Sequence, residues 1–325
     1  MNLVLAFAAA VSLTFPAGVP LSSEEPQTAS ITWAVTPASA AGPDGRSWVE
    51  HELDPGETIT EHLAVRNLST VAAEFRLSAA DGYFTRTGRF NMLPSGHPSE
   101  AAGTWLDVQG SVRVEPGDVA VIPYTLTVPE NATPGDHAAG IAASIRSERA
   151  GGSGTIGVES RVGFRVITRV AGELRPGMAI DAVTTSYAHS WNPLAPGTLT
   201  IGYIATNTGN AQLAYEDQIN AGERTRRGDL LPGETRTVEI EQAAWPLIVV
   251  PVDLELSATA PGSEDGAVAV KETILVWAIP WPQLAVLAGV ALLVVAGIAG
   301  RRRSQTRLQE RLDEARERGR REALG

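Results

Sequence analysis

Few residues of this chain have the types and spacing that catalysis requires. The five histidines show neither the HExxH spacing of a zinc helix nor any other paired spacing: His51, His62, His97, His137 and His189. The chain has no Cys and a single Lys, Lys271, which leaves no candidate for thiol chemistry, for a cysteine-ligated metal or for a Ser-Lys dyad. A function must be argued from a site, and no enzymatic site is visible. The sequence therefore predicts a protein that is not an enzyme, with no catalytic residue, no metal and no cofactor.

The first candidate binding site is a stretch of aromatic and arginine side chains at 81–90. Aromatic rings offer an apolar face to the C–H groups of sugars, and Arg donates hydrogen bonds to carboxylates or hydroxyls of a glycan. A Pro/Gly/Ser-rich loop at 93–103 follows and is longer than a compact sandwich needs. The residues predicted to bind a glycan or a partner are Tyr83, Phe84, Arg86, Arg89 and Phe90. The alternative is that the three aromatic side chains pack a hairpin against the sandwich.

The second candidate is a row of arginines spaced four residues apart on one face of a strand: Arg161, Arg165 and Arg169, with Arg146 as a further candidate. On an acidic outer part of the molecule this row could meet an anionic wall polymer or an acidic partner. The alternative is a sheet edge that charge protects from aggregation.

The elements that must position these residues are β-strands, because short alternating apolar runs are separated by Pro-Gly, Asn and Gly turn signals from residue 31 onward. The segments 54–70 and 195–210 share one order: a Pro-Gly turn, an alternating run, and a turn that contains Asn. Further Pro-Gly turns at 115–118 and 231–234 each begin another strand. Pro sets φ, and Gly tolerates a positive φ. The repetition predicts one domain fold used twice.

The clearest strand pair is a long hairpin with a turn at 151–154. Its second strand, from Thr155 to Ala171, alternates apolar and charged residues, which predicts one buried face. The apolar positions are Ile156, Val158, Val162, Phe164, Val166 and Val170. The partner strand contributes Ala139, Ile141, Ala143 and Ile145.

The predicted fold class is all-β, with two tandem immunoglobulin-like β-sandwich domains followed by one transmembrane helix. The predicted boundaries are a signal peptide at 1–30, a first sandwich at 31–172, a second sandwich at 173–272, a transmembrane helix at 273–300 and a basic cytoplasmic tail at 301–325.

The span is predicted from a charge-free run, 274–299, which is long enough to cross the hydrocarbon core. Trp277 and Trp281 stand at its leading end, where indole rings rest among headgroups. Arg301, Arg302 and Arg303 close the other end, where cations stay in the cytoplasm. The sequence thus predicts a single-pass protein of the plasma membrane, with an extracellular N-terminal part, a cytoplasmic tail and lipid contact through one span.

Charge is divided between the two sides of the span. The tail 301–325 holds nine Arg against five Asp or Glu, a balance of +4 within a total of −11, so everything before it sums to −15. An acidic outer part argues against a nucleic-acid partner, because phosphate binding requires a basic face.

Two stretches carry a resemblance to a known family: LDPGETITEHLAVRNLSTVAAEFRLSAADGYF and SVRVEPGDVAVIPYTLTVPENATPGDHAAGI. With the signal peptide, the second β domain, the span and the basic tail, they resemble the WxL-interacting cell-surface proteins of Gram-positive bacteria, in an actinobacterial form. The first domain of that family is described as peptidoglycan-binding, and the second as host- or partner-binding. The resemblance implies adhesion or scaffolding at the cell wall.

The predicted function is non-enzymatic binding of peptidoglycan, another cell-wall polymer or a wall-associated surface protein, through the extracellular part. The alternative is a structural or sensory membrane subunit that recruits a protein partner through that part or through the helical tail. A third hypothesis, a membrane-tethered hydrolase, requires a polar site that the fold assembles from distant strands.

Overall fold

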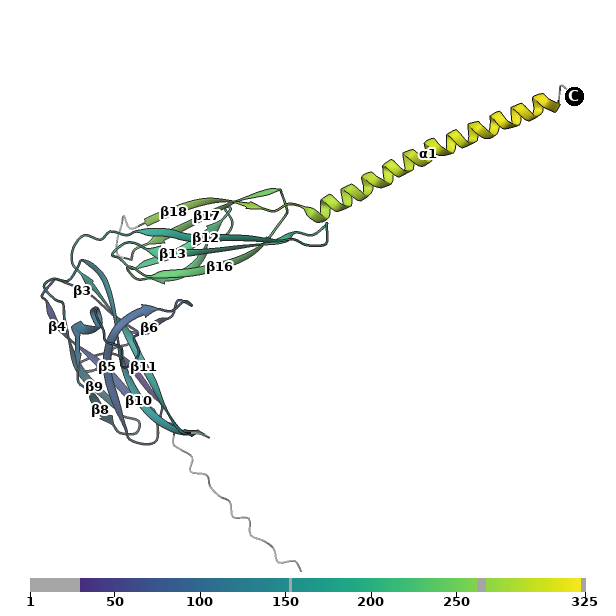
Figure 1. The fold of residues 1–325 in the computed structure, drawn as a ribbon. Helices are drawn as coiled ribbons and strands as arrows, with labels where there is room; N and C mark the ends of the chain where they lie inside the picture. Colours follow the sequence, from purple (N-terminus) through teal and green to yellow (C-terminus); the bar gives the residue numbers. More distant parts are fainter. Residues whose placement is uncertain (1–29, 152–153, 262–266, 323–325) are drawn as a thin grey trace, which may run out of the picture.

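The computed structural model describes residues 30–151, 154–261 and 267–322, so the predicted signal peptide lies outside the described residues except for Ser30. The described chain is mostly β, with one long helix, α1 (Trp281–Glu322), at its C-terminal end. Figure 1 shows two groups of strands that follow each other along the chain, and α1 projecting from the second group. We call these groups the N-terminal and the C-terminal sheet pair.

The N-terminal sheet pair consists of two sheets with a mixed strand order. The first sheet has the order β2 (Gly42–Pro43), β1 (Trp33–Ser39), β4 (Thr58–Asn67), β9 (Val119–Thr127), β7 (Leu106–Val108). The second has the order β3 (Val49–Leu53), β11 (Gly154–Val170), β10 (Gly135–Gly151), β5 (Ala73–Phe84), β6 (Phe90–Met92), and β8 (Ser111–Val114) also pairs with β5. A short 3-10 helix, Ala102–Trp105, precedes β7.

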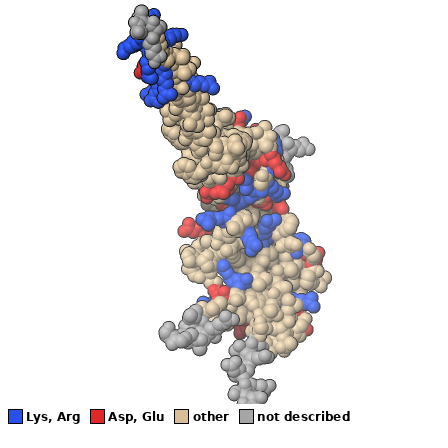
Figure 2. Space-filling view, turned by 90° about the vertical axis from the view of Figure 1, so that its right-hand side faces the viewer, with Lys and Arg blue, Asp and Glu red and all other residues tan. Residues whose placement is uncertain are grey.

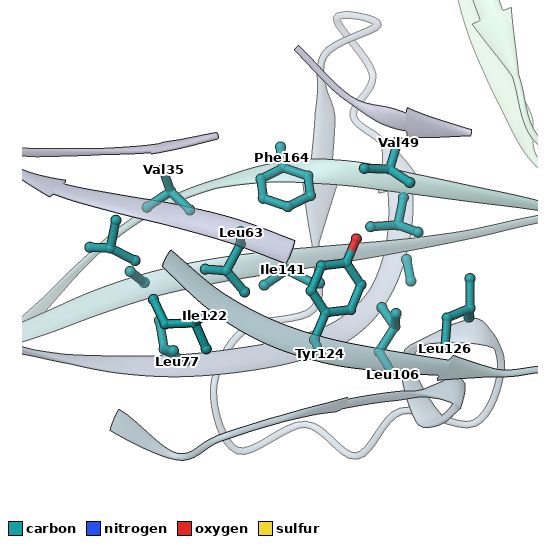
Figure 3. Packing of buried hydrophobic residues seen from close by; sticks show 14 of the residues in the cluster. Val35, Val49, Leu63, Leu77, Leu106, Ile122, Tyr124, Leu126, Ile141 and Phe164 are labelled. Carbon is teal, nitrogen blue, oxygen red and sulfur yellow. The ribbon is translucent and has the colours of Figure 1, made fainter. Parts of the chain in front are cut away.

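Both sheets of this pair contribute side chains to one hydrophobic core. Leu63, Ile122 and Tyr124 come from the first sheet, and Ile141 and Phe164 from the second (Figure 3). On β9 the buried Ile122 and Tyr124 flank the exposed Pro123, as expected when a sheet has one dry face. The predicted strand of residues 58–66 is confirmed as β4.

The predicted hairpin is confirmed as β10 and β11, in which Ala139 lies opposite Val166. The prediction of one continuous buried face is only partly correct, because Val158 and Val162 are exposed. β5 pairs with β10 only as far as Ser144, so the hairpin extends beyond its neighbour as a two-stranded ribbon with little to cover it. The turn residues 152–153 and the side chain of Ile156 lie outside the described residues.

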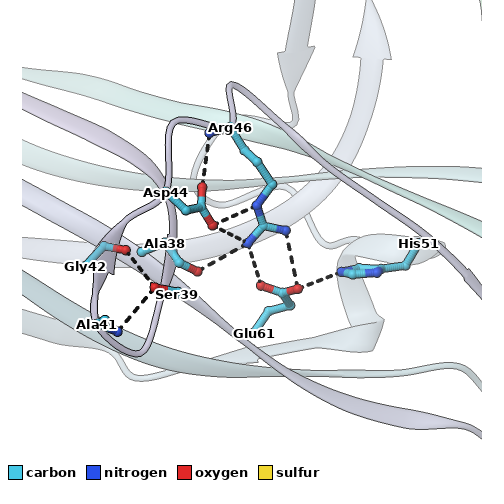
Figure 4. A network of polar contacts seen from close by, with 8 residues as sticks. All are labelled: Ala38, Ser39, Ala41, Gly42, Asp44, Arg46, His51 and Glu61. Atoms are coloured by element: carbon cyan, nitrogen blue, oxygen red, sulfur yellow. Dashed lines mark hydrogen bonds and ion pairs between the residues drawn. The ribbon is translucent and has the colours of Figure 1, made fainter.

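A polar network joins the two sheets at one end of the N-terminal sheet pair (Figure 4). Glu61 on β4 accepts a hydrogen bond from Arg46 at 3.0 Å and lies 2.9 Å from Nε2 of His51 on β3. Arg46 also binds Asp44. Burial opposes ionisation of Glu61, but the hydrogen bonds and charge of Arg46 outweigh it and hold the pKa of Glu61 below its usual value.

The C-terminal sheet pair has a three-stranded and a four-stranded sheet. The first has the order β12 (Met178–Ala188), β13 (Gly197–Asn207), β16 (Thr235–Ala244). The second has the order β15 (Thr225–Leu230), β14 (Leu213–Ile219), β17 (Val249–Thr259), β18 (Ala267–Trp277). Tyr203 from one sheet and Tyr215, Leu254 and Leu256 from the other share a core that is separate from that of the N-terminal sheet pair.

The repeated turn pattern has a physical basis in two buried asparagines. The amide of Asn67 donates to the carbonyl oxygens of Val71 and Val114, and that of Asn207 donates to those of Ala211 and Leu230. Each Asn also accepts a backbone hydrogen bond at its own turn, from Ser69 or from Gly209. Both asparagines satisfy backbone groups that a buried turn would otherwise leave without partners.

The Pro-Gly turns are equivalent in three of the four predicted places. Gly56, Gly117 and Gly233 have φ of 83°, 79° and 75°, the left-handed conformation that Gly tolerates, and each turn precedes a strand. The prediction is wrong at Gly197, which has no positive φ and is the first residue of β13. Glycine is required there because a Cβ would lie 2.4 Å from the carbonyl oxygen of Ala188.

Helix α1 begins at Trp281, eight residues after the predicted start of the span at 273. Residues up to Trp277 form β18, in which Trp277 lies opposite Val249, because a short apolar run with β-branched residues suits a buried strand as well as a helix. Pro280 and Pro282 lie just before and in the first turn, where no intrahelical donor is lost. The helix continues through the predicted tail to Glu322.

Helix α1 is long and apolar enough to cross a membrane, and its apolar segment is not buried against the rest of the protein. Figure 2 shows the uncharged shaft of the helix between the body of the molecule and the basic residues near its end. Near the end of the helix, Glu314 and Arg318 form an ion pair at 3.3 Å, one turn apart.

Candidate functional site

Two of the aromatic residues predicted to bind a glycan, Phe84 and Phe90, lie between the two sheet pairs. Phe84 and Phe90 face each other across the β5–β6 hairpin, with ring centroids 5.9 Å apart in an edge-to-face arrangement. Phe84 is buried against Ile167 of the same sheet pair and Leu231 of the C-terminal one. For Phe84 and Phe90 these contacts agree with the alternative hypothesis, in which the aromatic side chains pack the hairpin against a sandwich and do not bind a glycan.

A half-buried carboxylate fixes the same contact. The backbone N–H of Phe84 donates to Oε1 of Glu234 at 2.5 Å, and the other oxygen of Glu234 accepts from the N–H of Leu231 at 2.9 Å. Burial raises the pKa of Glu234 above its usual value, although both backbone hydrogen bonds act against the shift. The β5–β6 hairpin is therefore tied to the C-terminal sheet pair close to its turn, at the last residue pair of the hairpin.

The remaining residues of this stretch stay at the surface. Arg86 and Arg89 are exposed at the tip of the hairpin. Tyr83 is half-buried, and its hydroxyl accepts a hydrogen bond from the amide of Asn91 at 3.2 Å. Among the predicted aromatic residues, Tyr83 is the one whose polar end remains near solvent.

The three arginines of the predicted row have three different environments. Arg161 donates to the carbonyl oxygens of Met92 and Leu93. The guanidinium of Arg165 lies 4.5 Å from the centre of the Trp48 ring, a cation–π distance. Arg169 makes a bidentate pair with Asp136, at 2.7 and 3.0 Å. Each of the three arginines thus has a partner within the protein, and the row does not form a continuous cationic face.

The Asp136–Arg169 pair belongs to a second contact between the sheet pairs that the sequence did not reveal. Hydrogen bonds with Asp136 raise the pKa of Arg169. Asp136 also accepts from the backbone N–H of Gln212 at 2.6 Å, and its own N–H donates to the carbonyl oxygen of Asn210 at 2.8 Å. The side chain of Asn210 donates to the carbonyl oxygens of Pro134 and Glu173. One turn of the C-terminal sheet pair therefore holds both the N-terminal sheet pair and the linker.

A polar hollow lies on the outer face of β5, β8, β10 and β11. Its volume is about 410 Å³, and charged and hydroxyl side chains dominate its lining. The lining residues are Glu74, Arg76, Gly110, Ser111, Ser144, Ile145, Arg146 and Glu159. This polar hollow alternates cationic donors with anionic acceptors, an arrangement suited to a ligand that carries hydroxyls, amides and charges of both signs.

The connection after β6 crosses the same face. The hydroxyl of Ser95 donates to Glu159 at 2.8 Å, and Arg161 holds Leu93. The hydrogen bond from Ser95 is the main reason that the pKa of Glu159 lies below its usual value. Beyond this crossing a smaller hollow of about 190 Å³ lies beside Phe90, Asn91 and Arg161. The long connection predicted at 93–103 is thus held against the sheet by side chains of β11.

Sequence reasoning found part of this face. Arg146 and Arg161 were singled out, but Glu74, Arg76 and Glu159 were not. The signal was present as alternating polar residues on β5, β10 and β11, which place their side chains on one face. What the sequence lacks is the strand order, which brings β5 beside β10. Among the described residues, no group of three or more His, Asp or Glu could hold a metal ion.

No protein-family model matches the sequence, and no curated protein matches it. Several solved structures match the chain at low identity and low TM-score. The crystal structure of the class 5 fimbriae chaperone CfaA has a TM-score of 0.35 and 10% identity, and the match covers 74% of this chain and 99% of that chain. The E. coli chaperone DraB has a TM-score of 0.31 and 11% identity, over 74% and 98% of the two chains. The PapD-like domain of human CEP192 has a TM-score of 0.26 and 15% identity, over 52% and 99%.

Proposed function

We propose that this chain is a membrane-anchored, non-enzymatic surface protein whose N-terminal sheet pair binds peptidoglycan through the polar hollow. The observation that carries the proposal is the polar hollow itself, where Arg76, Arg146, Glu74 and Glu159 converge with two serine hydroxyls. Peptidoglycan presents sugar hydroxyls, amides and peptide carboxylates in repeating order. Guanidinium groups donate to carboxylates in pairs, and the serines and glutamates complement hydroxyl and amide groups.

The anchor is helix α1. Its residues 281–300 contain no charged side chain and extend over about 30 Å at 1.5 Å per residue, the thickness of the hydrocarbon core. Arg301, Arg302 and Arg303 follow directly and favour a cytoplasmic C-terminal end. In this topology the two sheet pairs are tandem immunoglobulin-like domains outside the plasma membrane. The resemblance to WxL-interacting proteins supports the same arrangement.

Sedimentation with purified peptidoglycan tests the binding. The full chain, held in detergent micelles, is expected to sediment with the polymer. Arg76→Glu and Arg146→Glu place a carboxylate in the polar hollow and are each expected to weaken retention about tenfold, which corresponds to about 1.4 kcal/mol. Arg66→Glu is the matched control, because Arg66 is an exposed arginine on β4 of the other sheet.

Equal retention of all three variants would contradict the assignment to the polar hollow. Failure of the unmodified chain to sediment would remove peptidoglycan as the ligand.

A protein partner is the second candidate, because one edge of β11 is open. β11 pairs with β10 along its whole length, but β3 covers its other edge only from Val166 to Val170. On the described part of the remaining edge, residues 157–165, Val158 and Val162 are exposed. An extended segment of a partner could add a strand there. A photo-crosslinking residue at Val158 is expected to capture such a partner in cells, whereas one at the exposed Val119 on β9 is not.

A further inference from the structure

Exposed tryptophans gather at the end of the C-terminal sheet pair where α1 begins. Trp191, Trp245, Trp277 and Trp281 are 93%, 55%, 70% and 60% exposed, and they are four of the seven tryptophans in the chain. Trp is a costly residue to leave in water, because its indole has a large apolar area. Four of them at one end need an explanation.

The strand register places these residues together. Gly197 lies opposite Ala244, so the loop 189–196 adjoins the loop 245–248. Val249 lies opposite Trp277, so the second loop adjoins the chain that leads into α1. The backbone N–H of Ala278 donates to the carbonyl oxygen of Ile248 at 3.0 Å.

Helix α1 is fixed to the same end. The side-chain amide of Gln283, in the first turn of α1, donates to the carbonyl oxygen of Pro193 at 3.0 Å. Loop 189–196 therefore lies directly beside the point where the uncharged shaft of the helix begins. Any lipid around the first turn of α1 would also meet this loop.

The composition of the end is unusual for a surface in water. Leu194, Leu247 and Ile248 are exposed beside the tryptophans. The segments 189–196, 245–248 and 277–283 contain no Asp, Glu, Lys or Arg, although the chain before residue 301 carries a net charge of −15. A contiguous apolar end without charge marks an interaction surface. We call it the tryptophan collar: Trp191, Leu194, Trp245, Leu247 and Ile248, with Trp277 and Trp281.

We propose that the tryptophan collar lies in the headgroup layer of the outer leaflet, so that the C-terminal sheet pair rests directly on the bilayer around the base of α1. This inference rests on the proposed membrane anchor. Continuity with α1 selects lipid as the occupant, because the collar adjoins the first turn of a helix that is long enough to span a bilayer. Indole rings prefer the interface, where the ring meets acyl chains and the N–H meets polar groups.

The consequence concerns the orientation of the outer part. A helix joined by a short free linker lets its extracellular part tilt at random, but loops 189–196 and 245–248 would add further contacts that hold the C-terminal sheet pair at the membrane surface. The contacts at Asp136 and Glu234 would then pass this orientation to the N-terminal sheet pair and set the height of the polar hollow above the lipid.

The absence of Cys makes the test direct, because one introduced Cys is the only thiol in the chain. Trp191→Cys, Trp245→Cys and Trp281→Cys are each labelled with a nitroxide in the full chain, reconstituted into vesicles of phosphatidylglycerol and phosphatidylethanolamine. Leu68→Cys is the matched control, because Leu68 is an exposed apolar residue of the N-terminal sheet pair. Electron paramagnetic resonance compares collisions with oxygen, which concentrates in lipid, with collisions with a water-soluble nickel complex.

We expect labels at 191, 245 and 281 to collide more with oxygen than with nickel, and the label at 68 to do the reverse. If 281 shows lipid contact while 191 and 245 behave like 68, the tryptophan collar is overturned and the anchor stands. If 281 itself behaves like 68, the membrane anchor is overturned. Circular dichroism of each labelled protein confirms that the strands are retained.

Discussion

The turns that follow β4 and β13 are built alike but serve different purposes. The side chains of Asn67 and Asn207 make equivalent hydrogen bonds. The backbone carbonyl oxygen of each also accepts a hydrogen bond from the glycine of a Pro-Gly turn, Gly117 for Asn67 and Gly233 for Asn207. The turn after Asn67 ends within its own sheet pair. The turn after Asn207 carries Asn210, which binds Pro134, Glu173 and the neighbouring strand β10. The difference teaches that the residues after the shared asparagine decide whether the turn only closes its own sheet pair or also connects the two sheet pairs.

The largest expected loss of stability comes from removing the Asp136–Arg169 ion pair at the contact between the sheet pairs. Asp136 and Arg169 have side chains that are 1% and 14% exposed, so Asp136→Ala leaves a nearly buried guanidinium without its partner. Such a change costs about 3–5 kcal/mol of unfolding free energy. Urea denaturation measures it. Asp253→Ala is the control, because its pair with Lys271 is exposed to solvent and contributes little to stability. Equal effects of the two variants would contradict a buried role for Asp136.

The next effect compares the two asparagines themselves. Asn67→Ala and Asn207→Ala each leave two buried carbonyl oxygens without a side-chain donor, at a cost of about 1–3 kcal/mol. Both variants are expected to lower the urea midpoint. Only Asn207→Ala should also change the distance between spin labels placed in the two sheet pairs. A change in that distance for Asn67→Ala would remove the distinction between the two turns.

An effect of similar size comes from the residue two positions after each asparagine. Ser69 occupies this place in the first turn, but at Gly209 a Cβ would lie 2.3 Å from the carbonyl oxygen of Arg175 in the linker. Gly209→Ser is therefore expected to push the linker away and cost about 1–3 kcal/mol, the usual cost of overpacking. Ser69→Gly removes the hydroxyl that contacts Asn67 and should leave the distance between the sheet pairs unchanged. Distance measurements between paired spin labels distinguish the outcomes.

The smallest effect is a pH dependence of opposite sign in the two regions. The folded-state pKa of Glu61 is lowered, so its stabilising contribution is complete above the unfolded pKa and is lost as the pH falls. The folded-state pKa of Glu234 is raised, so ionisation costs stability as the pH rises from the unfolded pKa through the folded one. Glu61→Gln should flatten the loss of stability in acid, and Glu234→Gln should flatten the decline above it. Urea midpoints between pH 3 and 7 measure both, and unchanged profiles would refute the assignments.

The sequence predicted the local features well because they depend on neighbouring residues. The β10–β11 hairpin, the left-handed glycines at 56, 117 and 233, and the uncharged helix all follow from alternation, turn chemistry or length. The start of the span was wrong because residues 274–277 are apolar enough for either a helix or a strand. Their pairing with β17, a tertiary contact, decides between the two.

The candidate site was less predictable because it depends on strand order. Phe84 was chosen for its aromatic ring, but its burial depends on Leu231, almost 150 residues away in the chain. Glu74 and Glu159 come together only because β5 lies beside β10 and β10 beside β11. No local pattern specifies those neighbours. Single-sequence reasoning identified the types of residue that line the face and missed which ones share it.

Helix α1 continues without a break from Trp281 to Glu322, a length of about 63 Å at 1.5 Å per residue. In the proposed membrane anchor, roughly half of that length is enough to traverse the hydrocarbon, and the remainder continues beyond it as helix. If the sheet pairs tilt about the segment in the bilayer, the C-terminal end of α1 moves in the opposite direction. Under the proposed anchoring, a force on the sheet pairs would in this way move the C-terminal end of α1 without a hinge within the helix.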